Sequence, residues 1–258
     1  MVRVASVWLS LLALAGNATA ASSEKIDVPV RGRTLTVSLY RPAGTARGTI
    51  FMGSGDVGWV GLAVSMAEDY AKQGYLIVGI NVRQYLSAFT SGASHLQTSD
   101  VPGDYRVIRD RVLQRTALPR RIVTAGVSEG AALAVLAASD AANHQWIDGV
   151  ITMGLPMTAE LAWRWTDIAA WITKRDANEP SFSPLDVIAR VAPAPLFMIQ
   201  SKKDEYVTRD DYEKLFAAAK EPKKLVLIDA SNHRFTDKRE ELRRAFAEGL
   251  AWIGMVRR

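Results

Sequence analysis

The stretch RIVTAGVSEGAALAVLA, residues 121–137, decides how this chain folds. A run of β-forming residues ends at Gly126, and an alanine-rich run typical of a helix follows directly. Ser128 lies between Gly126 and Gly130 in the pattern G-x-S-x-G. Glycines at the flanking positions allow a sharp strand-to-helix turn, because side chains there would clash. Ser128 is therefore either a reactive nucleophile at the apex of this turn or only a small residue that the turn requires.

Other apolar runs alternate with helical patterns on both sides of this turn. Near-continuous apolar strands separated by helices predict an α/β fold with a mostly parallel sheet and helices on both faces. The predicted strands are 48–55, 75–82, 120–127, 147–154, 194–200 and 223–230, and the predicted helices are 60–73, 103–115, 129–139, 209–220 and 237–255.

Two further segments shape this prediction. The run 26–44 reads as two extended segments joined by a turn at 31–33, so we expect an antiparallel N-terminal hairpin at one edge of the sheet. The residues between the second strand and Ser99 are expected to form a polar loop. Residues 155–190 interrupt the alternation before the strand 194–200, and we expect a lid-like cap insertion there.

The insertion contains three tryptophans that offer two interpretations. Trp163, Trp165 and Trp171 either line an apolar substrate pocket, together with Trp59, or belong to a helix that packs them into the core.

Composition excludes several classes of protein. The chain has 258 residues and no cysteine, so disulfides, thiolate catalysis and cysteine metal sites are excluded. The net charge of +5 comes from scattered basic residues without an aromatic-interleaved stripe, which argues against nucleic-acid binding. Such a charge is compatible with transient contact with an anionic membrane surface.

The N-terminus predicts export. An early arginine precedes the apolar stretch 4–15, and Ala18-Thr19-Ala20 has the small-x-small pattern of a cleavage site. The apolar stretch is shorter than the roughly 18–20 residues that a spanning helix needs. We therefore expect a cleaved signal peptide over residues 1–20 and a single domain over 21–258, located in the periplasm or secreted.

A serine nucleophile needs a base, and the base needs an acid that orients it. His233 directly follows the last predicted strand, and Asp204 lies in the loop after the strand 194–200. The carboxyl ends of parallel strands meet at one edge of the sheet, so Ser128, Asp204 and His233 are expected to converge there. Glu205 is the alternative acid. His95 precedes the serine in sequence, and His144 falls at the opposite edge of the sheet.

The segment Gly53-Ser54-Gly55-Asp56-Val57-Gly58 matches a dinucleotide fingerprint, G-x-G-x-x-G, after a strand and before a helix. No acidic residue ends the next strand to hold a ribose, but Arg83 could meet a 2′-phosphate. An NADP-binding oxidoreductase therefore remains an alternative.

The order Ser128, Asp204, His233 with a G-x-S-x-G turn resembles the α/β-hydrolase superfamily, over most of the chain after the signal peptide. The resemblance implies an α/β-hydrolase fold, a Ser-His-Asp triad and an acyl-enzyme, with no metal or organic cofactor. It also implies that the loop after the strand 48–55 supplies half of an oxyanion hole. The backbone N–H groups of Asp56 and Glu129 would then be the donors.

The run from Ser54 to Trp59, SGDVGW, is similar to the loop SGDGGW of VirJ/AcvB-type exported bacterial hydrolases. For that group the implied substrate is an aminoacylated phospholipid, lysyl-phosphatidylglycerol. This chain departs from the pattern at Val57. The sequence thus predicts an exported serine hydrolase acting on a small-molecule or lipid ester. The side chain of Glu129 is expected to be an ordinary helix N-terminal acid, with contact to a cationic substrate group as the alternative. A catalytically silent binding protein on the same scaffold is a further alternative.

Overall fold

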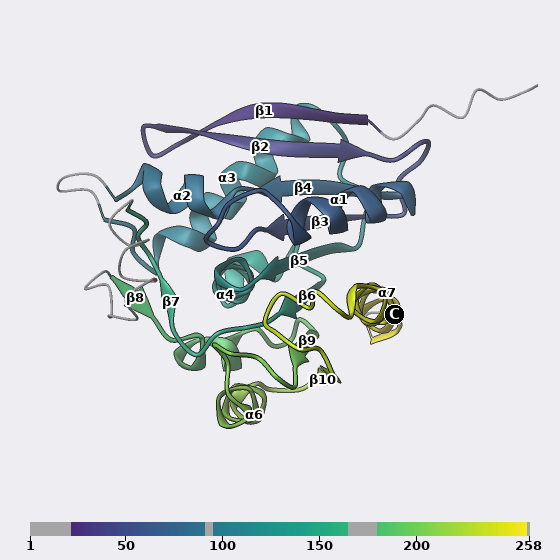
Figure 1. The fold of residues 1–258 in the computed structure, drawn as a ribbon. Coiled ribbons are helices and arrows are strands. Elements are labelled where there is room, and N and C mark those ends of the chain that lie inside the picture. The colour runs from purple at the N-terminus through teal and green to yellow at the C-terminus, as the bar shows by residue number, and fades with distance from the viewer. Residues whose placement is uncertain (1–21, 91–94, 165–179, 257–258) are drawn as a thin grey trace, which may run out of the picture.

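An eight-stranded sheet forms the centre of the protein, whose computed structural model describes residues 22–90, 95–164 and 180–256 (Figure 1). The strand order is β1-β2-β4-β3-β5-β6-β9-β10. Neighbours from β4 to β10 pair in parallel, whereas β1 with β2 and β2 with β4 pair antiparallel. The bounds are β1 Ser22–Val30, β2 Arg33–Arg41, β3 Gly48–Gly53, β4 Tyr75–Ile80, β5 Ile122–Val127, β6 Gly149–Met153, β9 Leu196–Ser201 and β10 Lys223–Ile228.

The α/β fold predicted from the sequence is confirmed, including the antiparallel hairpin at the edge of the sheet. All six residues of β3, of β5 and of β9 are buried, because helices cover both faces of these central strands. Arg31, in the hairpin turn, donates hydrogen bonds to both carboxylate oxygens of Asp104 at 2.9 and 2.7 Å. This pair holds the hairpin against the helix that contains Asp104.

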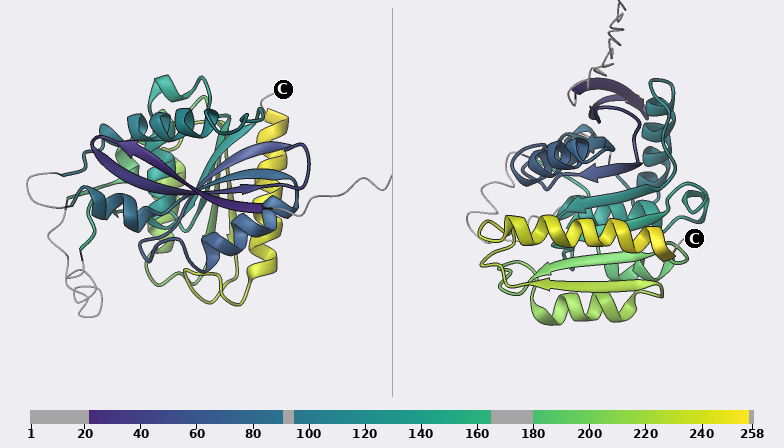
Figure 2. Two further views of the ribbon diagram at one scale, coloured as in Figure 1. Left: turned by 90° about the horizontal axis from the view of Figure 1, so that it is seen from above. Right: turned by 90° about the vertical axis from the view of Figure 1, so that its right-hand side faces the viewer.

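Two layers of helices enclose the sheet. The core on one face contains residues of α1 and α7, and the core on the other face contains residues of α2, α3, α4 and α6. Figure 2 shows α7 lying along the strands near the end of the sheet that contains β9 and β10. The bounds are α1 Leu62–Lys72, α2 Val82–Ala88, α3 Asp100–Leu113, α4 Glu129–Ala138, α6 Arg209–Ala218 and α7 Arg239–Val256, with short 3-10 turns at Ala141–Asn143, Pro184–Asp186 and Ile188–Arg190.

Helix α2 occupies part of the segment for which a polar loop was predicted, so that prediction was wrong. The Asn81 side chain caps α2 by accepting a hydrogen bond from the Gln84 backbone N–H at 3.2 Å. Val82, Tyr85 and Leu86 are buried at helical spacing. The capping residue and the helical spacing were visible in the sequence, but a pattern of only seven residues is too short to predict a helix from.

The interval 155–190 is described only at its two ends. There β7 (Ala159–Glu160) pairs antiparallel with β8 (Ser181–Phe182) to form a separate two-stranded sheet. Residues 165–179, with Trp165 and Trp171, lie outside the described residues, and so does the predicted signal peptide over residues 1–20.

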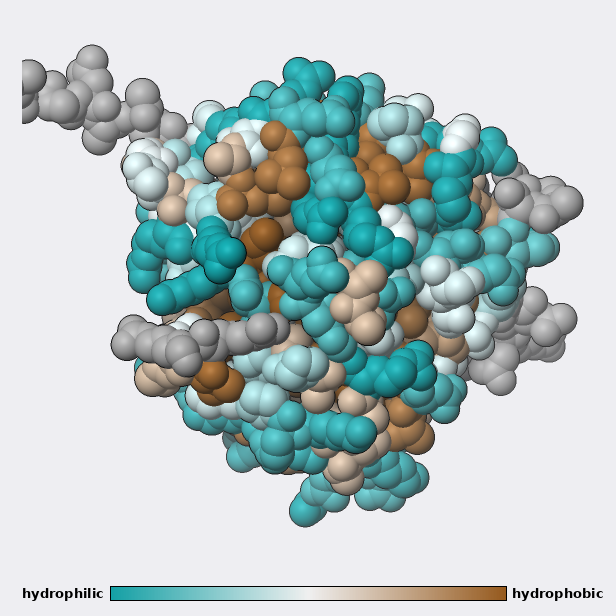
Figure 3. Space-filling model, turned by 180° about the vertical axis from the view of Figure 1, so that it is seen from behind, coloured by the Kyte–Doolittle hydropathy of each residue, from teal (hydrophilic) through white to brown (hydrophobic). Residues whose placement is uncertain are grey.

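Hydrophilic residues cover most of the face seen from behind, and apolar residues lie there in separate patches (Figure 3). Within the described ranges, no helix combines the length and the apolar character that crossing a membrane requires.

Helix α4 starts in direct backbone contact with the loop after β3. A Cβ atom on Gly130 would lie 2.3 Å from the Ser54 carbonyl oxygen and 2.6 Å from the Gly53 carbonyl carbon. A Cβ atom on Gly126 would lie 2.1 Å from the carbonyl of Gly130. Since neighbouring backbone blocks both positions, only glycine allows β5 to turn into α4 at this place.

We expect Gly130→Ala to lower the free energy of unfolding by at least about 3 kcal/mol, because the Ser54 and Gly53 backbone must move to admit a methyl group. Gly103→Ala is the matched control. Gly103 lies within α3, and the atom nearest to its Cβ position is 3.7 Å away, so this change should stabilise the protein by about 0.5–1 kcal/mol. Urea unfolding measures both, and equal effects of the two variants would contradict the close contact at Gly130.

Candidate active site

Ser128 occupies a strained position between β5 and α4. Its φ and ψ are 53° and −121°, which is a conformation that non-glycine residues rarely adopt. The Ser128 backbone N–H donates to the Met153 carbonyl at 3.0 Å, and its carbonyl accepts from the N–H groups of Ala131 and Ala132. Strain of this kind costs about 1–3 kcal/mol and persists where the surrounding structure enforces it. The geometry is that of the sharp turn predicted from G-x-S-x-G.

Asp204 and His233 form the hydrogen bond that the sequence predicted. His233 Nδ1 lies 2.7 Å from Asp204 Oδ2, and the two side chains are 8% and 1% exposed. The other carboxylate oxygen of Asp204 accepts from the backbone N–H groups of Tyr206 and Val207 at 2.9 and 3.0 Å. The carboxylate is therefore fixed by the loop after β9 before it meets the ring.

Ser128 and His233 lie on either side of the end of β6. Ser128 is hydrogen-bonded to Met153, as described above, and the next residue is Gly154, which has a φ of 65°. A Cβ atom on Gly154 would lie 2.6 Å from His233 Cε1, so the ring packs directly on this glycine. In Figure 1 the loop between β3 and α1 and the loop between β10 and α7 both lie near the end of α4. The three predicted residues thus meet at one edge of the sheet.

The environment of His233 favours its charged form. Burial lowers the pKa of the imidazole, but the hydrogen bond to Asp204 and the charge of Asp204 raise it, with smaller contributions from Glu129 and Glu205. The net effect is a pKa above the ordinary histidine value of 6.5. His233 Nε2 is buried and makes no hydrogen bond within the described residues. With Nδ1–H directed at Asp204, the neutral ring presents Nε2 as a proton acceptor.

The loop after β3 lies against Ser128. A Cβ atom on Gly55 would be 3.8 Å from Ser128 Cβ. Ser54 anchors this loop, because its hydroxyl accepts from the Val82 N–H at 3.0 Å and donates to the Gly55 carbonyl at 2.9 Å. Among the described residues, the Asp56 and Glu129 N–H groups make no hydrogen bond to a backbone carbonyl. The Asp56 N–H follows Gly55 in this loop and the Glu129 N–H follows Ser128, and Ser54 is a positioning residue that the sequence did not reveal.

The Glu129 side chain is not an ordinary solvated acid at a helix N-terminus. Its Oε2 atom is buried and makes no hydrogen bond within the described part of the chain. Burial raises the pKa of this carboxyl, and the nearby charge of Asp56 raises it further. Hydrogen bonding by the Ser128 hydroxyl and by the Glu129 backbone amide acts in the opposite direction. The site thus contains a partly buried carboxyl group, with one buried oxygen, next to the serine.

The other candidate residues have different partners. Glu205, the alternative acid, accepts the His233 backbone N–H at 2.7 Å and so positions the loop rather than the ring nitrogen. His95 is exposed, and His144 Nε2 lies 2.9 Å from the Ala138 carbonyl. Neither of these two histidines contacts Asp204.

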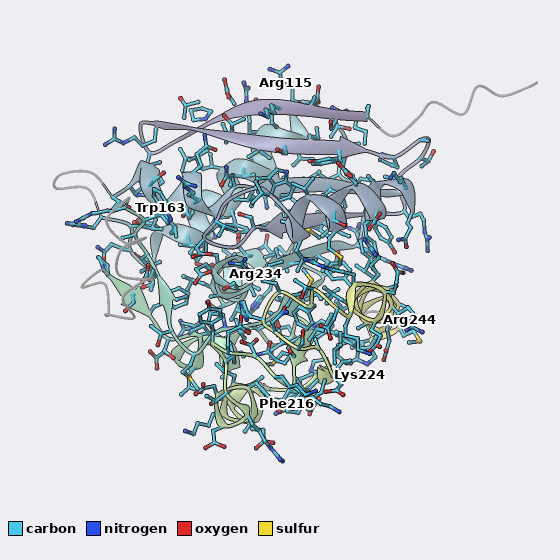
Figure 4. All side chains as sticks on the ribbon, in the orientation of Figure 1. Arg115, Trp163, Phe216, Lys224, Arg234 and Arg244 are labelled. Carbon is cyan, nitrogen blue, oxygen red and sulfur yellow. The ribbon has the colours of Figure 1, made fainter. Side chains whose placement is uncertain are left out.

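Trp59 and Trp163 line a common cavity beside the loop between β3 and α1. The Trp59 indole N–H donates to the Tyr40 hydroxyl at 3.1 Å. The Trp163 ring faces the Arg83 guanidinium, whose central carbon is 4.0 Å from the ring centroid. Figure 4 shows Trp163 on the side of α2, away from Arg234, the chain neighbour of His233. The two other predicted pocket residues, Trp165 and Trp171, are not described.

Comparison with solved structures supports the same architecture. The esterase domain of a Rhodothermus marinus protein has a TM-score of 0.61 at 17% identity, covering 88% of this chain and 97% of that one. A putative dienelactone hydrolase from Klebsiella pneumoniae has a TM-score of 0.69 at 14% identity, covering 91% and 99%. Est1E from Butyrivibrio proteoclasticus has a TM-score of 0.63 at 14% identity, covering 89% and 98%. At these identities the likeness concerns the fold.

The parallel sheet with its antiparallel edge and the strained serine turn define an α/β-hydrolase fold. A family model described as bacterial virulence protein (VirJ) matches residues 48–251, and the chain belongs to this family. Among curated proteins, the uncharacterized protein YfhR of Escherichia coli is 38% identical over 68 residues, which are 26% of this chain. The match spans 24% of YfhR, or about a quarter of its length.

We expect Ser128→Gly to be about 1 kcal/mol more stable than Ser128→Ala. Glycine adopts a φ of 53° without strain, whereas alanine is as strained there as serine. The free energy gained by relieving the strain exceeds the loss of stability of about 0.4–1 kcal/mol that the greater freedom of glycine in the unfolded chain causes. Urea unfolding of both variants measures the difference. At Ser38 in β2, which has no positive φ, the order should reverse, and Ser38→Ala should be the more stable. The same order at both positions would contradict strain at Ser128.

Proposed function

We propose that this protein is a serine hydrolase that cleaves a carboxylic ester, with Ser128 as nucleophile, His233 as general base and Asp204 as the residue that orients the base. The observation that carries the proposal is the 2.7 Å contact between His233 and a carboxylate fixed by two backbone N–H groups, beside a strained serine. The fold alone would not be sufficient, because α/β folds serve many functions.

In the proposed reaction, Ser128 Oγ attacks the ester carbonyl while its proton moves to His233 Nε2. Asp204 stabilises the imidazolium that forms. The N–H groups of Asp56 and Glu129 are proposed to stabilise the oxyanion, and each such donor contributes about 3 kcal/mol in known hydrolases. The imidazolium then protonates the departing alcohol. Water, deprotonated by His233, attacks the acyl-enzyme, and the acid is released as Ser128 recovers its proton.

The glycines of the 53–58 segment favour this function over NADP binding. A Cβ atom on Gly53 would lie 2.9 Å from Gly130 Cα, so glycine is needed there for contact with the serine turn, and Gly55 lies beside Ser128. A dinucleotide fingerprint would instead use them to approach a pyrophosphate.

Among esters, we favour those with an ammonium group in the acyl part, as in an aminoacylated phospholipid. Glu129 supports this choice, because an ammonium group would provide the partner that its buried Oε2 does not have within the described residues. The resemblance to VirJ/AcvB-type hydrolases implies the same class. A panel of short esters, lipid esters and aminoacyl phospholipids ranks these substrates directly.

We also propose that the chain is exported and acts in the periplasm or outside the cell, where it meets anionic membrane surfaces. The signal-like sequence of residues 1–20 and the net charge of +5 support this. N-terminal sequencing of the protein recovered from the periplasm tests it, and a start near Ala21 is expected.

Ser128→Ala should lower kcat for p-nitrophenyl esters by about 10⁵–10⁶-fold, because no other group replaces the nucleophile. It should also abolish labelling by a fluorophosphonate probe, mapped by mass spectrometry. Ser38→Ala, on β2, is the matched control and should keep full labelling.

Retained turnover in the Ser128→Ala protein would overturn the proposal. A wild-type protein that is folded but neither labelled nor active would be a binding protein instead. A thermal shift with NADP and no labelling would favour the oxidoreductase.

The acid limb of kcat/KM should lie above pH 6.5, because the base must be neutral and the pKa of His233 is raised above that value. Glu205→Gln removes a negative charge that raises this pKa, so the limb should move to lower pH while the carbonyl oxygen still accepts the His233 N–H. Glu213→Gln, on the exposed side of α6, should leave the limb in place. A shift to higher pH in Glu205→Gln would contradict the assignment.

A further inference from the structure

A cavity of about 530 Å³ lies between the β3–α1 loop and the start of α2. Its lining includes Val57, Asn81, Arg83, Gln84, Trp163 and Arg164. Ser128, Asp204 and His233 are not part of the lining, so the reaction described above leaves this cavity without a role.

The polar groups of the cavity favour an anion. Two guanidinium groups, those of Arg83 and Arg164, are in the lining, and no carboxylate of a described residue is. Asn81 uses its side-chain oxygen to accept the Gln84 N–H at 3.2 Å, and Gln84 uses its side-chain oxygen to accept the Thr36 N–H at 3.1 Å. What both amides can still offer a ligand are their N–H donors.

Arg83 is held in position by its surroundings. Its guanidinium stacks on the Trp163 ring at 4.0 Å, and its aliphatic atoms lie 3.5 and 3.6 Å from the Cβ position of Gly58. Stacking uses the face of the guanidinium, whereas an anion binds to the N–H groups along its edge. The ordering cost of a flexible arginine is therefore reduced before a ligand arrives.

A phosphate group fits these donors better than a carboxylate does. A phosphate monoester has three terminal oxygens and a charge between about −1.5 and −2, whereas a carboxylate has two oxygens and a single charge, so the phosphate matches two guanidinium groups and amide N–H groups better. A water molecule takes about 30 Å³, so a cavity of about 530 Å³ also has room for the organic group attached to the phosphate.

The cavity is close enough to Ser128 to hold part of the same substrate. The Cβ position of Gly55 is 3.8 Å from Ser128 Cβ, and Val57, in the cavity wall, follows two residues later. Consecutive Cα atoms are about 3.8 Å apart, so the Cα atoms of Gly55 and Val57 are at most about 8 Å apart. The cavity wall therefore begins within a short distance of Ser128.

We propose that this cavity is a phosphate-binding subsite, which holds a phosphate ester group of the substrate whose acyl bond Ser128 attacks. The role of the subsite in catalysis rests on the proposed hydrolase function. Binding of the phosphate itself is independent of that function. Arg83 and Arg164 are the specificity-determining residues of the subsite.

Calorimetric titration of the wild-type protein with glycerol 3-phosphate tests binding without any turnover. Binding is expected for glycerol 3-phosphate and for inorganic phosphate, but not for glycerol or acetate at the same concentrations. Arg83→Gln and Arg164→Gln should each weaken binding at least tenfold. Arg115→Gln, which removes one charge from an exposed residue distant from Trp163 in Figure 4, should change it less than twofold. Absence of phosphate binding, or an equal loss in Arg115→Gln, would overturn the subsite.

A kinetic comparison then tests the link to catalysis. The ratio of kcat/KM for butyryl-glycerol 3-phosphate to that for butyryl-glycerol should fall at least tenfold in Arg83→Gln and stay unchanged in Arg115→Gln. Phosphate binding without hydrolysis of either ester would refute the hydrolase function but keep the subsite. An unchanged ratio in Arg83→Gln, with active enzyme, would overturn the role of the subsite in catalysis.

Competition experiments identify the source of the phosphate. Displacement of glycerol 3-phosphate by phosphatidylglycerol vesicles supports the subsite with a lipid headgroup as its ligand, and no displacement supports it with a soluble phosphate ester. Tight binding of NADP that depends on Arg83, in a protein that hydrolyses no ester, would overturn the proposal in favour of nucleotide binding.

Discussion

The backbone contact between the loop after β3 and the first turn of α4 is the constraint on which the rest of the site depends. Gly130 lies so close to Gly53 and Ser54 that no side chain fits between them. Ser128, two residues before Gly130, has a positive φ, and the loop after β3 lies beside it. Packing of two backbones thus sets the position of Ser128, and the buried sheet around it maintains the strained conformation.

The remaining parts of the site come from strand ends that the parallel sheet brings together. β9 is followed by Asp204 and β10 by the loop with His233, while the end of β6 provides the glycine on which the histidine ring packs. Local hydrogen bonds then refine this coarse placement. Two backbone N–H groups hold Asp204, so the carboxylate meets the imidazole without having to become ordered first.

The site has an acidic side and a basic side. Glu129 and Asp204 lie near the serine and the histidine, whereas Arg83 and Arg164 line the cavity beyond the loop between β3 and α1. Such a separation of charge fits a substrate that is cationic near its acyl group and anionic further along. The proposed aminoacyl ester and the proposed phosphate subsite are two ends of one such molecule, although each rests on its own contacts.

By itself the sequence determined the sheet and the hairpin, because fully buried strands read as apolar runs. It also predicted that Ser128, Asp204 and His233 converge, because a parallel sheet brings its strand ends to one edge. The structure brings Asp204 and His233 into contact close to the G-x-S-x-G turn, and their role in a reaction stays a prediction. Helix α2 was not predicted, because the capping residue Asn81 and an apolar pattern of seven residues are weak local signals. Only the tertiary structure decided the burial of Glu129 Oε2, the anchoring by Ser54 and the cavity around Arg83. They depend on contacts between residues that are distant in the chain, and a linear pattern contains no information on which side chains the packing will enclose.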